Sequence, residues 1–161
     1  MPRVIKSISE AKLLVGEEVG LSDWFVVDQH RIDQFAEATA DHQWIHVDTE
    51  RAAREMPGGK TIAHGYLTLA LIPAMTENFL RVENVVRAVN FGLNKVRFYA
   101  PIPVGSRLRG RGAVLQARQR AGALLLISEV RIEVEGQRKP ACVAETLGMY
   151  FFNEENASAP D

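Results

Sequence analysis

Cysteine and long apolar runs are both scarce in this chain. Its 161 residues include one cysteine, Cys142, so no disulfide can form within the chain, and this scarcity fits a reducing compartment. The longest apolar segment, 66–75, is much shorter than the roughly 20 residues that a membrane-spanning helix requires. Residues 1–15 lack the apolar stretch of a secretory signal. We therefore expect a cytoplasmic protein that has no membrane partner.

An excess of charge of one sign is also absent. The formal net charge is −1, so no overall field draws the protein to nucleic acid. Glycine-rich phosphate loops do not occur, and neither does the Gly-x-Ser-x-Gly turn of serine hydrolases. The histidines His42, His46 and His64 do not show the spacing of a metal site on one regular element. These absences argue against a nucleotide cofactor, a bound metal and a nucleic-acid partner.

The first part of the chain combines helix caps with helical spacing of apolar residues. Ser7 and Glu10 match a capping box at the start of a short helix. Asp28 can cap a second helix that runs to about Ala40. The other elements expected here are a strand over 24–27, a loop over 41–47 and a short helix over 48–54.

The rest of the chain predicts one buried helix followed by a sheet. The segment after Gly65 is apolar on nearly every side, which is typical of a buried helix, and Pro73 should bend its axis. From Val85 onward, apolar residues recur at every second position, as in long antiparallel strands joined by short turns. We expect an α+β domain, a curved antiparallel sheet wrapped around a long central helix, over residues 1–152. The polar segment 153–161 is expected to be a flexible tail.

An acid and an imidazole lie close together in the loop after the second helix. Asp41 and His46 are separated by four residues, so their side chains can converge on one point. A carboxylate titrates near pH ~3.9 and an imidazole near ~6.5, so the pair can hold a water and move its proton. This arrangement suits the addition of water to an activated double bond, or the reverse reaction. The alternative is that Asp41 caps a turn and His46 packs in the core.

A glycine at the start of the buried helix supplies a second chemical element. The first amides of a helix have no partner within it and carry partial positive charge, and Gly65 would let a substrate carbonyl approach its N–H. The alternative is a glycine that only begins a helix. His64 is expected to support the pocket. Gln43 could hydrogen-bond the loop or a water, and Trp44 is expected to anchor the loop rather than to wall the pocket.

Basic residues gather on the predicted strands. Such groups could bind a phosphate-bearing substrate, although a solvated strand face is the simpler explanation. The residues in question are Lys95, Arg97, Arg107, Arg109 and Arg111.

These residues together resemble the hydratase-2 motif of the MaoC-like dehydratases. The resemblance lies in Phe35-Ala36, Asp41, His46 and Asp48, followed by Ile62-Ala63-His64-Gly65. The segment Gln43-Trp44-Ile45-His46 is most similar to the NodN-like branch of this family. The resemblance implies a hot-dog fold, a homodimer, and reversible hydration of a trans-2-enoyl-CoA to an (R)-3-hydroxyacyl-CoA. It assigns catalysis to Asp41 and His46 and carbonyl binding to the Gly65 amide. It implies no cofactor beyond the coenzyme A of the substrate, whose phosphates the basic residues could contact.

The sequence also departs from the motif, and other functions stay open. Many members carry Asn and Pro where this chain has Gln43 and Trp44, a change that bears on the acyl-chain preference and on turnover. One alternative is an acyl-CoA thioesterase, because one fold can host both chemistries. The other is a protein that binds an acyl-CoA or a partner without turnover.

Overall fold

The computed structural model describes residues 2–153, so the predicted tail lies outside the described residues except for Asn153. The first half contains short strands and helices, and the second half contains four long strands. The elements are β1 (Arg3–Ile5), α1 (Ile8–Leu13), β2 (Glu18–Leu21), β3 (Phe25–Val27), α2 (Gln29–Thr39), α3 (Trp44–Val47), α4 (Thr49–Glu55), the 3-10 turn η1 (Pro57–Gly59), α5 (Gly65–Ala70), α6 (Ile72–Thr76), β4 (Leu80–Val82), β5 (Val85–Phe98), β6 (Ser106–Arg120), β7 (Ala123–Val134) and β8 (Cys142–Phe152).

The long strands form the antiparallel sheet that the sequence predicts. Its hydrogen-bonded order is β2-β6-β7-β8-β5, and β3 also pairs with β6. A small separate sheet joins β1 to β4 in parallel. Strands β1, β2 and β4 were not expected, because three or four residues are too few to show a period of two. Strand β5 is an edge of the large sheet, and almost all of its side chains are exposed.

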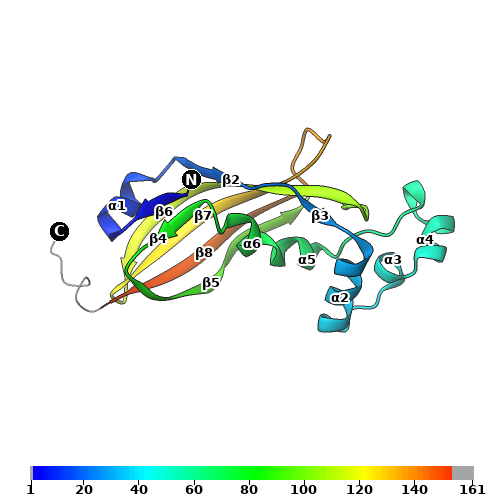
Figure 1. The fold of residues 1–161 in the computed structure, drawn as a ribbon, viewed down its shortest axis with the longest axis horizontal. Coiled ribbons are helices and arrows are strands. Elements are labelled where there is room, and N and C mark those ends of the chain that lie inside the picture. The colour runs from blue at the N-terminus through cyan, green and yellow to red at the C-terminus, as the bar shows by residue number, and fades with distance from the viewer. Residues whose placement is uncertain (1, 154–161) are drawn as a thin grey trace.

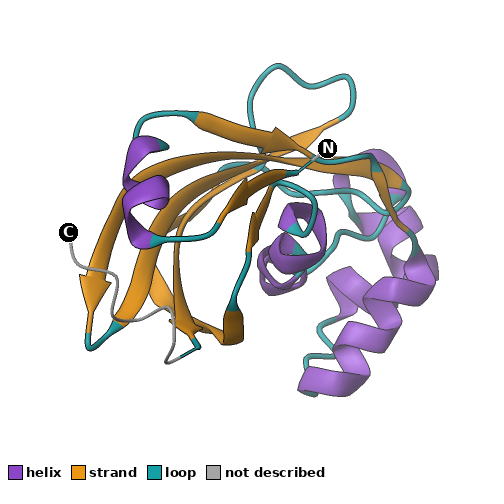
Figure 2. Ribbon diagram, turned by 60° about the vertical axis from the view of Figure 1, so that its left-hand side comes forward, coloured by secondary structure: helices purple, strands orange, loops and turns teal. Residues whose placement is uncertain are grey.

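The sheet curves around the helical segment α5–α6, which lies along its concave face (Figures 1 and 2). Glycines on β6 allow this close approach. A Cβ on Gly112 would lie 2.7 Å from a ring carbon of Phe79, the aromatic residue that follows α6. Gly110 packs against Met75 in the same way, with 3.0 Å between its virtual Cβ and that of Met75. The α+β architecture with a curved sheet around a central helix is therefore confirmed.

The central helix differs from the prediction in two respects. It consists of two short helices that meet at Leu71, because Pro73 has no N–H to donate to the preceding turn. In addition, only one side of it is buried. Leu67, Leu71 and Met75 face the core, whereas Tyr66 is 70 % exposed. An apolar face of the helix is thus left open within one chain.

The helices α2, α3 and α4 gather at one end of the sheet (Figure 1). Asp28 caps α2 as predicted, since its carboxylate accepts a hydrogen bond from the Arg31 N–H. The segment 41–47 was expected to be a loop, but its second half forms α3. Asp48 then caps α4. No helix in the described part of the chain is long and apolar enough to cross a membrane.

Candidate active site

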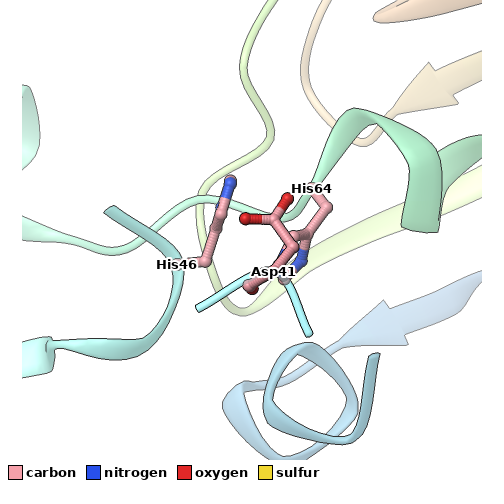
Figure 3. Close-up of side chains that lie close together, drawn as sticks. All are labelled: Asp41, His46 and His64. Carbon is pink, nitrogen blue, oxygen red and sulfur yellow. The ribbon is translucent and has the colours of Figure 1, made fainter. Parts of the chain in front are cut away.

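Three titratable side chains from separate segments meet where the helical end joins the sheet. The left-handed conformation of Ala40, with φ at 57°, ends α2 and turns the chain into Asp41. His46 lies on α3, and His64 immediately precedes α5. One potential ligand atom from each of these side chains lies within 4.8 Å of the other two. Figure 3 shows the carboxylate of Asp41 and the rings of His46 and His64 close together, as the sequence predicted for the acid and the first imidazole.

The environment of His46 fixes its tautomer. Its Nδ1 lies 2.7 Å from the carbonyl oxygen of Ile62. A carbonyl only accepts, so Nδ1 carries the proton and Nε2 of the neutral ring keeps a lone pair. Burial lowers the pKa of His46 from its ordinary value; His64 lowers it further, while the Ile62 hydrogen bond and Asp41 oppose the shift. His46 is therefore held as a neutral base.

The carboxylate of Asp41 is exposed and weakly engaged. One of its oxygens accepts a 3.4 Å hydrogen bond from the Gln43 N–H. The backbone carbonyl of Asp41 makes a shorter contact, 3.0 Å to Nε2 of His64. Because that bond concerns the backbone, most of the accepting capacity of the carboxylate is available to a water or a substrate.

The two imidazoles are stacked. Their ring centroids are 3.8 Å apart and their planes differ by 24°. A metal bound by imidazole lies about 2.0–2.1 Å from a nitrogen, close to the ring plane. One ion cannot lie in two nearly parallel planes at this separation, so the geometry favours acid–base chemistry over metal binding.

A cavity of about 300 Å³ lies between His46 and the start of α5, and neither Asp41 nor His64 is among the residues that line it. His46 and Gly65 both line it, together with Thr68 and the aromatic residues Phe98 and Tyr99. The N–H of Gly65 is the first of its helix and has no acceptor within that helix. His46 and Gly65, the first residue of a helix, therefore border one largely apolar space, a combination typical of a small-molecule site.

Two supporting residues were missed by the sequence prediction. The amide nitrogen of Gln29 donates to the carbonyl of His46 over 2.8 Å. The amide oxygen of Gln29 accepts a 2.6 Å hydrogen bond from the hydroxyl of Thr61, which is 1 % exposed. Gln29 thus ties α3 to the strand-like segment before α5. No local signal reveals this, because a glutamine after a helix cap normally faces solvent.

The other predicted residues lie outside the cavity lining. The guanidinium of Arg51 lies over the ring of Trp44, 4.1 Å from its centroid, and Gln43 is exposed. Arg109 and Arg111 both bind Glu133, at 2.7 and 2.9 Å. Arg111 also pairs with Glu18, Arg107 pairs with Glu135 and Lys95 with Glu145, whereas Arg97 has no ion pair among the described residues. Burial raises the pKa of Cys142 to about 11, so its thiol is a core group.

Comparison with known proteins agrees with this geometry. The family described as "MaoC like domain" matches residues 10–134. The chain is 47 % identical over 149 residues to 3-hydroxyacyl-thioester dehydratase Z of Mycobacterium tuberculosis, covering 92 % of this chain and 98 % of that protein. It is 41 % identical to Nodulation protein N of Rhizobium meliloti, over 93 % of this chain and 94 % of that protein.

A solved structure supports the fold independently. R-Hydratase PhaJ1 from Pseudomonas aeruginosa superposes with a TM-score of 0.70 at 22 % identity, covering 86 % of this chain and 83 % of the other. The expectations of a hot-dog fold, a MaoC-like motif and a likeness to the NodN-like branch are thereby confirmed. This chain belongs to the MaoC-like dehydratase family and is an enzyme of the hydratase and dehydratase class.

Proposed function

We propose that this enzyme catalyses the reversible hydration of a trans-2-enoyl-CoA to an (R)-3-hydroxyacyl-CoA. The observation that carries the proposal is the convergence of the Asp41 carboxylate and the His46 imidazole beside the cavity that Gly65 also lines. The activities named for the relatives, those of a 3-hydroxyacyl-thioester dehydratase and an R-hydratase, support the thioester class and the (R) configuration.

The proposed chemistry moves one proton through His46. A water donates one hydrogen to the carboxylate of Asp41 and the other to the lone pair on Nε2 of His46. As the water oxygen bonds to C3 of the substrate, Nε2 takes the proton and the double bond shifts toward the thioester. The Gly65 N–H stabilises the resulting enolate oxygen, a contribution of about 3 kcal/mol for one such donor. The imidazolium then returns the proton to C2, and dehydration follows the same steps in reverse.

The direct test is the loss of the conjugated enoyl absorbance of crotonyl-CoA and of longer analogues. A chain-length series would also identify the preferred acyl group. Release of free thiol from acyl-CoA without hydration would instead support the thioesterase. Tight acyl-CoA binding with no turnover at any chain length would support the non-catalytic alternative and contradict the proposal.

We also propose a homodimer formed through β5 and the open face of α5–α6. Strand β5 is a sheet edge, whose unpaired backbone groups and apolar side chains are available to a partner. A second cavity, of about 420 Å³, lies between this strand and the helix and is lined by Phe91, Leu93 and Pro73. A second copy would cover both surfaces, which explains why the sequence of the helix is apolar on every side.

Light scattering on a size-exclusion column tests this assembly. Wild-type protein should be dimeric, and Leu93→Glu should shift it toward the monomer because a charge would be buried. Leu13→Glu is the matched control, since Leu13 lies on α1 and is 81 % exposed. A monomeric wild type, or equal behaviour of the two variants, would contradict the proposal.

The remaining expectations concern the coenzyme and the location. Arg97 is the best candidate for a phosphate of coenzyme A, because it precedes the cavity residue Phe98 and has no acidic partner among the residues described. The other four basic residues are occupied by glutamates. We propose no further cofactor, and a cytoplasmic location remains an expectation from the sequence.

A further inference from the structure

His64 contacts both halves of the acid–base pair, although it does not line the cavity. Its side chain is only 2 % exposed. One face of its ring stacks on His46, and Phe35 packs against it with ring centroids 5.0 Å apart. Its Nε2 lies 3.0 Å from the carbonyl oxygen of Asp41, and so Nε2 carries the proton. The opposite nitrogen, Nδ1, is buried and has no hydrogen-bond partner among the residues that the structure describes.

We propose that His64 is a positioning residue, which holds Asp41 and His46 in the arrangement that proton transfer requires. The expected change in kcat rests on the proposed function, whereas the expected change in the pKa of His46 does not.

The first contact fixes Asp41. This residue follows the end of α2 and is exposed, and within the described part of the chain its carboxylate is bound only to the nearby Gln43 N–H. Among the hydrogen bonds of the described residues, the bond from His64 is the one that ties Asp41 to a distant segment, 23 residues away. Without it, the carboxylate would depend on the φ and ψ angles of a short connection. Misplacement by about 1 Å can cost on the order of 10²-fold in rate.

The second contact fixes the ring of His46. The hydrogen bond from Nδ1 to Ile62 holds one edge of this ring, and the stacked His64 ring limits rotation about that bond. The titratable groups that act on His46 are His64, which lowers its pKa, and Asp41, which raises it. Burial is the largest cause of the lowered pKa of His46, and the stacked His64 ring acts in the same direction, so loss of this ring should raise that pKa.

Two substitutions separate these contacts. His64→Phe keeps a ring against His46 but cannot donate to the Asp41 carbonyl. His64→Gln keeps an N–H donor but removes the stacked ring. We expect His64→Phe to lower kcat about 10- to 100-fold with little change in KM, because binding of the substrate does not involve the lost bond. We expect His64→Gln to retain more activity and to move the acid limb of the pH profile to higher pH.

The experiment combines kinetics on crotonyl-CoA with an NMR titration of the His46 ring protons. His42→Gln is the control, because His42 is exposed and, among the described residues, forms its ion pair with Glu37 of α2, at 3.6 Å. Circular dichroism checks that each variant is folded. If His64→Phe does not fold, the NMR titration of His64→Gln decides the question.

The titration separates this inference from the proposed function, because it needs no substrate. A raised pKa of His46 in His64→Gln, with none in His42→Gln, supports the positioning role even if crotonyl-CoA is not turned over. An unchanged His46 titration together with kcat within twofold of wild type in both His64 variants would overturn it.

Discussion

Removal of the Gln29 side chain tests the support of the catalytic loop. Gln29→Ala leaves the Thr61 hydroxyl buried without its acceptor, at a cost of about 1–3 kcal/mol, and deletes the donor to the His46 carbonyl, worth about 1 kcal/mol more. We therefore expect the free energy of unfolding to fall by about 2–4 kcal/mol. Because α3 carries His46, kcat should fall as well, while KM should change little.

Urea unfolding and steady-state hydration kinetics measure the two effects. Thr61→Val removes the hydroxyl instead, and the double variant completes a thermodynamic cycle. The two side chains touch, so a coupling energy of about 0.5–3 kcal/mol is expected. A loss of less than about 0.5 kcal/mol in Gln29→Ala, or strict additivity, would show that this contact does not support the loop.

Three further predictions concern the core, the pH dependence and the carbonyl site. Gly112→Ala should destabilise the fold by about 1–3 kcal/mol in urea, because the new methyl group meets the ring of Phe79 at 2.7 Å, and Phe79→Leu should reduce this penalty. The kcat/KM for hydration should fall as pH drops through the pKa of His46, which burial holds below the ordinary imidazole value; a pH–rate profile whose acid limb lies above that ordinary value would contradict this. Gly65→Ala should unfold in urea much like wild type, because its methyl group meets Phe98 at 3.2 Å and this half-exposed ring can move aside. Hydration kinetics should nevertheless show a kcat/KM that is lower by about tenfold or more, because the substitution displaces the amide that binds the carbonyl.

Local patterns in the sequence predicted much of the fold. The caps at Ser7 and Asp28 mark helices that the structure contains, because capping is a contact between near neighbours. The alternation in β6 predicted its buried face correctly. In β7, by contrast, Leu126 and Ile127 are both buried, although successive residues of a strand point to opposite faces of the sheet. Ile127 belongs to a separate apolar cluster with Leu125 and Met149, and a period of two cannot reveal that both faces of the strand are buried there.

The site shows the same division between local and distant information. Asp41, His46 and Gly65 were predicted because residue types and spacing suffice to suggest the chemistry. The role of Gln29 was missed because its contact with His46 spans 17 residues. His64 was expected to support the pocket, but its contact with Asp41 spans 23 residues and is visible only in the folded chain. The open face of α5–α6 could not be foreseen either, since an apolar sequence does not say whether its own sheet covers every side of the helix.

The measurement that tests the central claim most directly is kcat/KM for enoyl-CoA hydration in Asp41→Asn, His46→Gln and the double variant, with His42→Gln as the control. If the pair acts on one water, each single variant should lose on the order of 10²–10⁴ in rate, and the double variant should lose little more than the worse of the two. Wild-type rates in both single variants, or losses that multiply in the double variant, would show that Asp41 and His46 do not work as a unit.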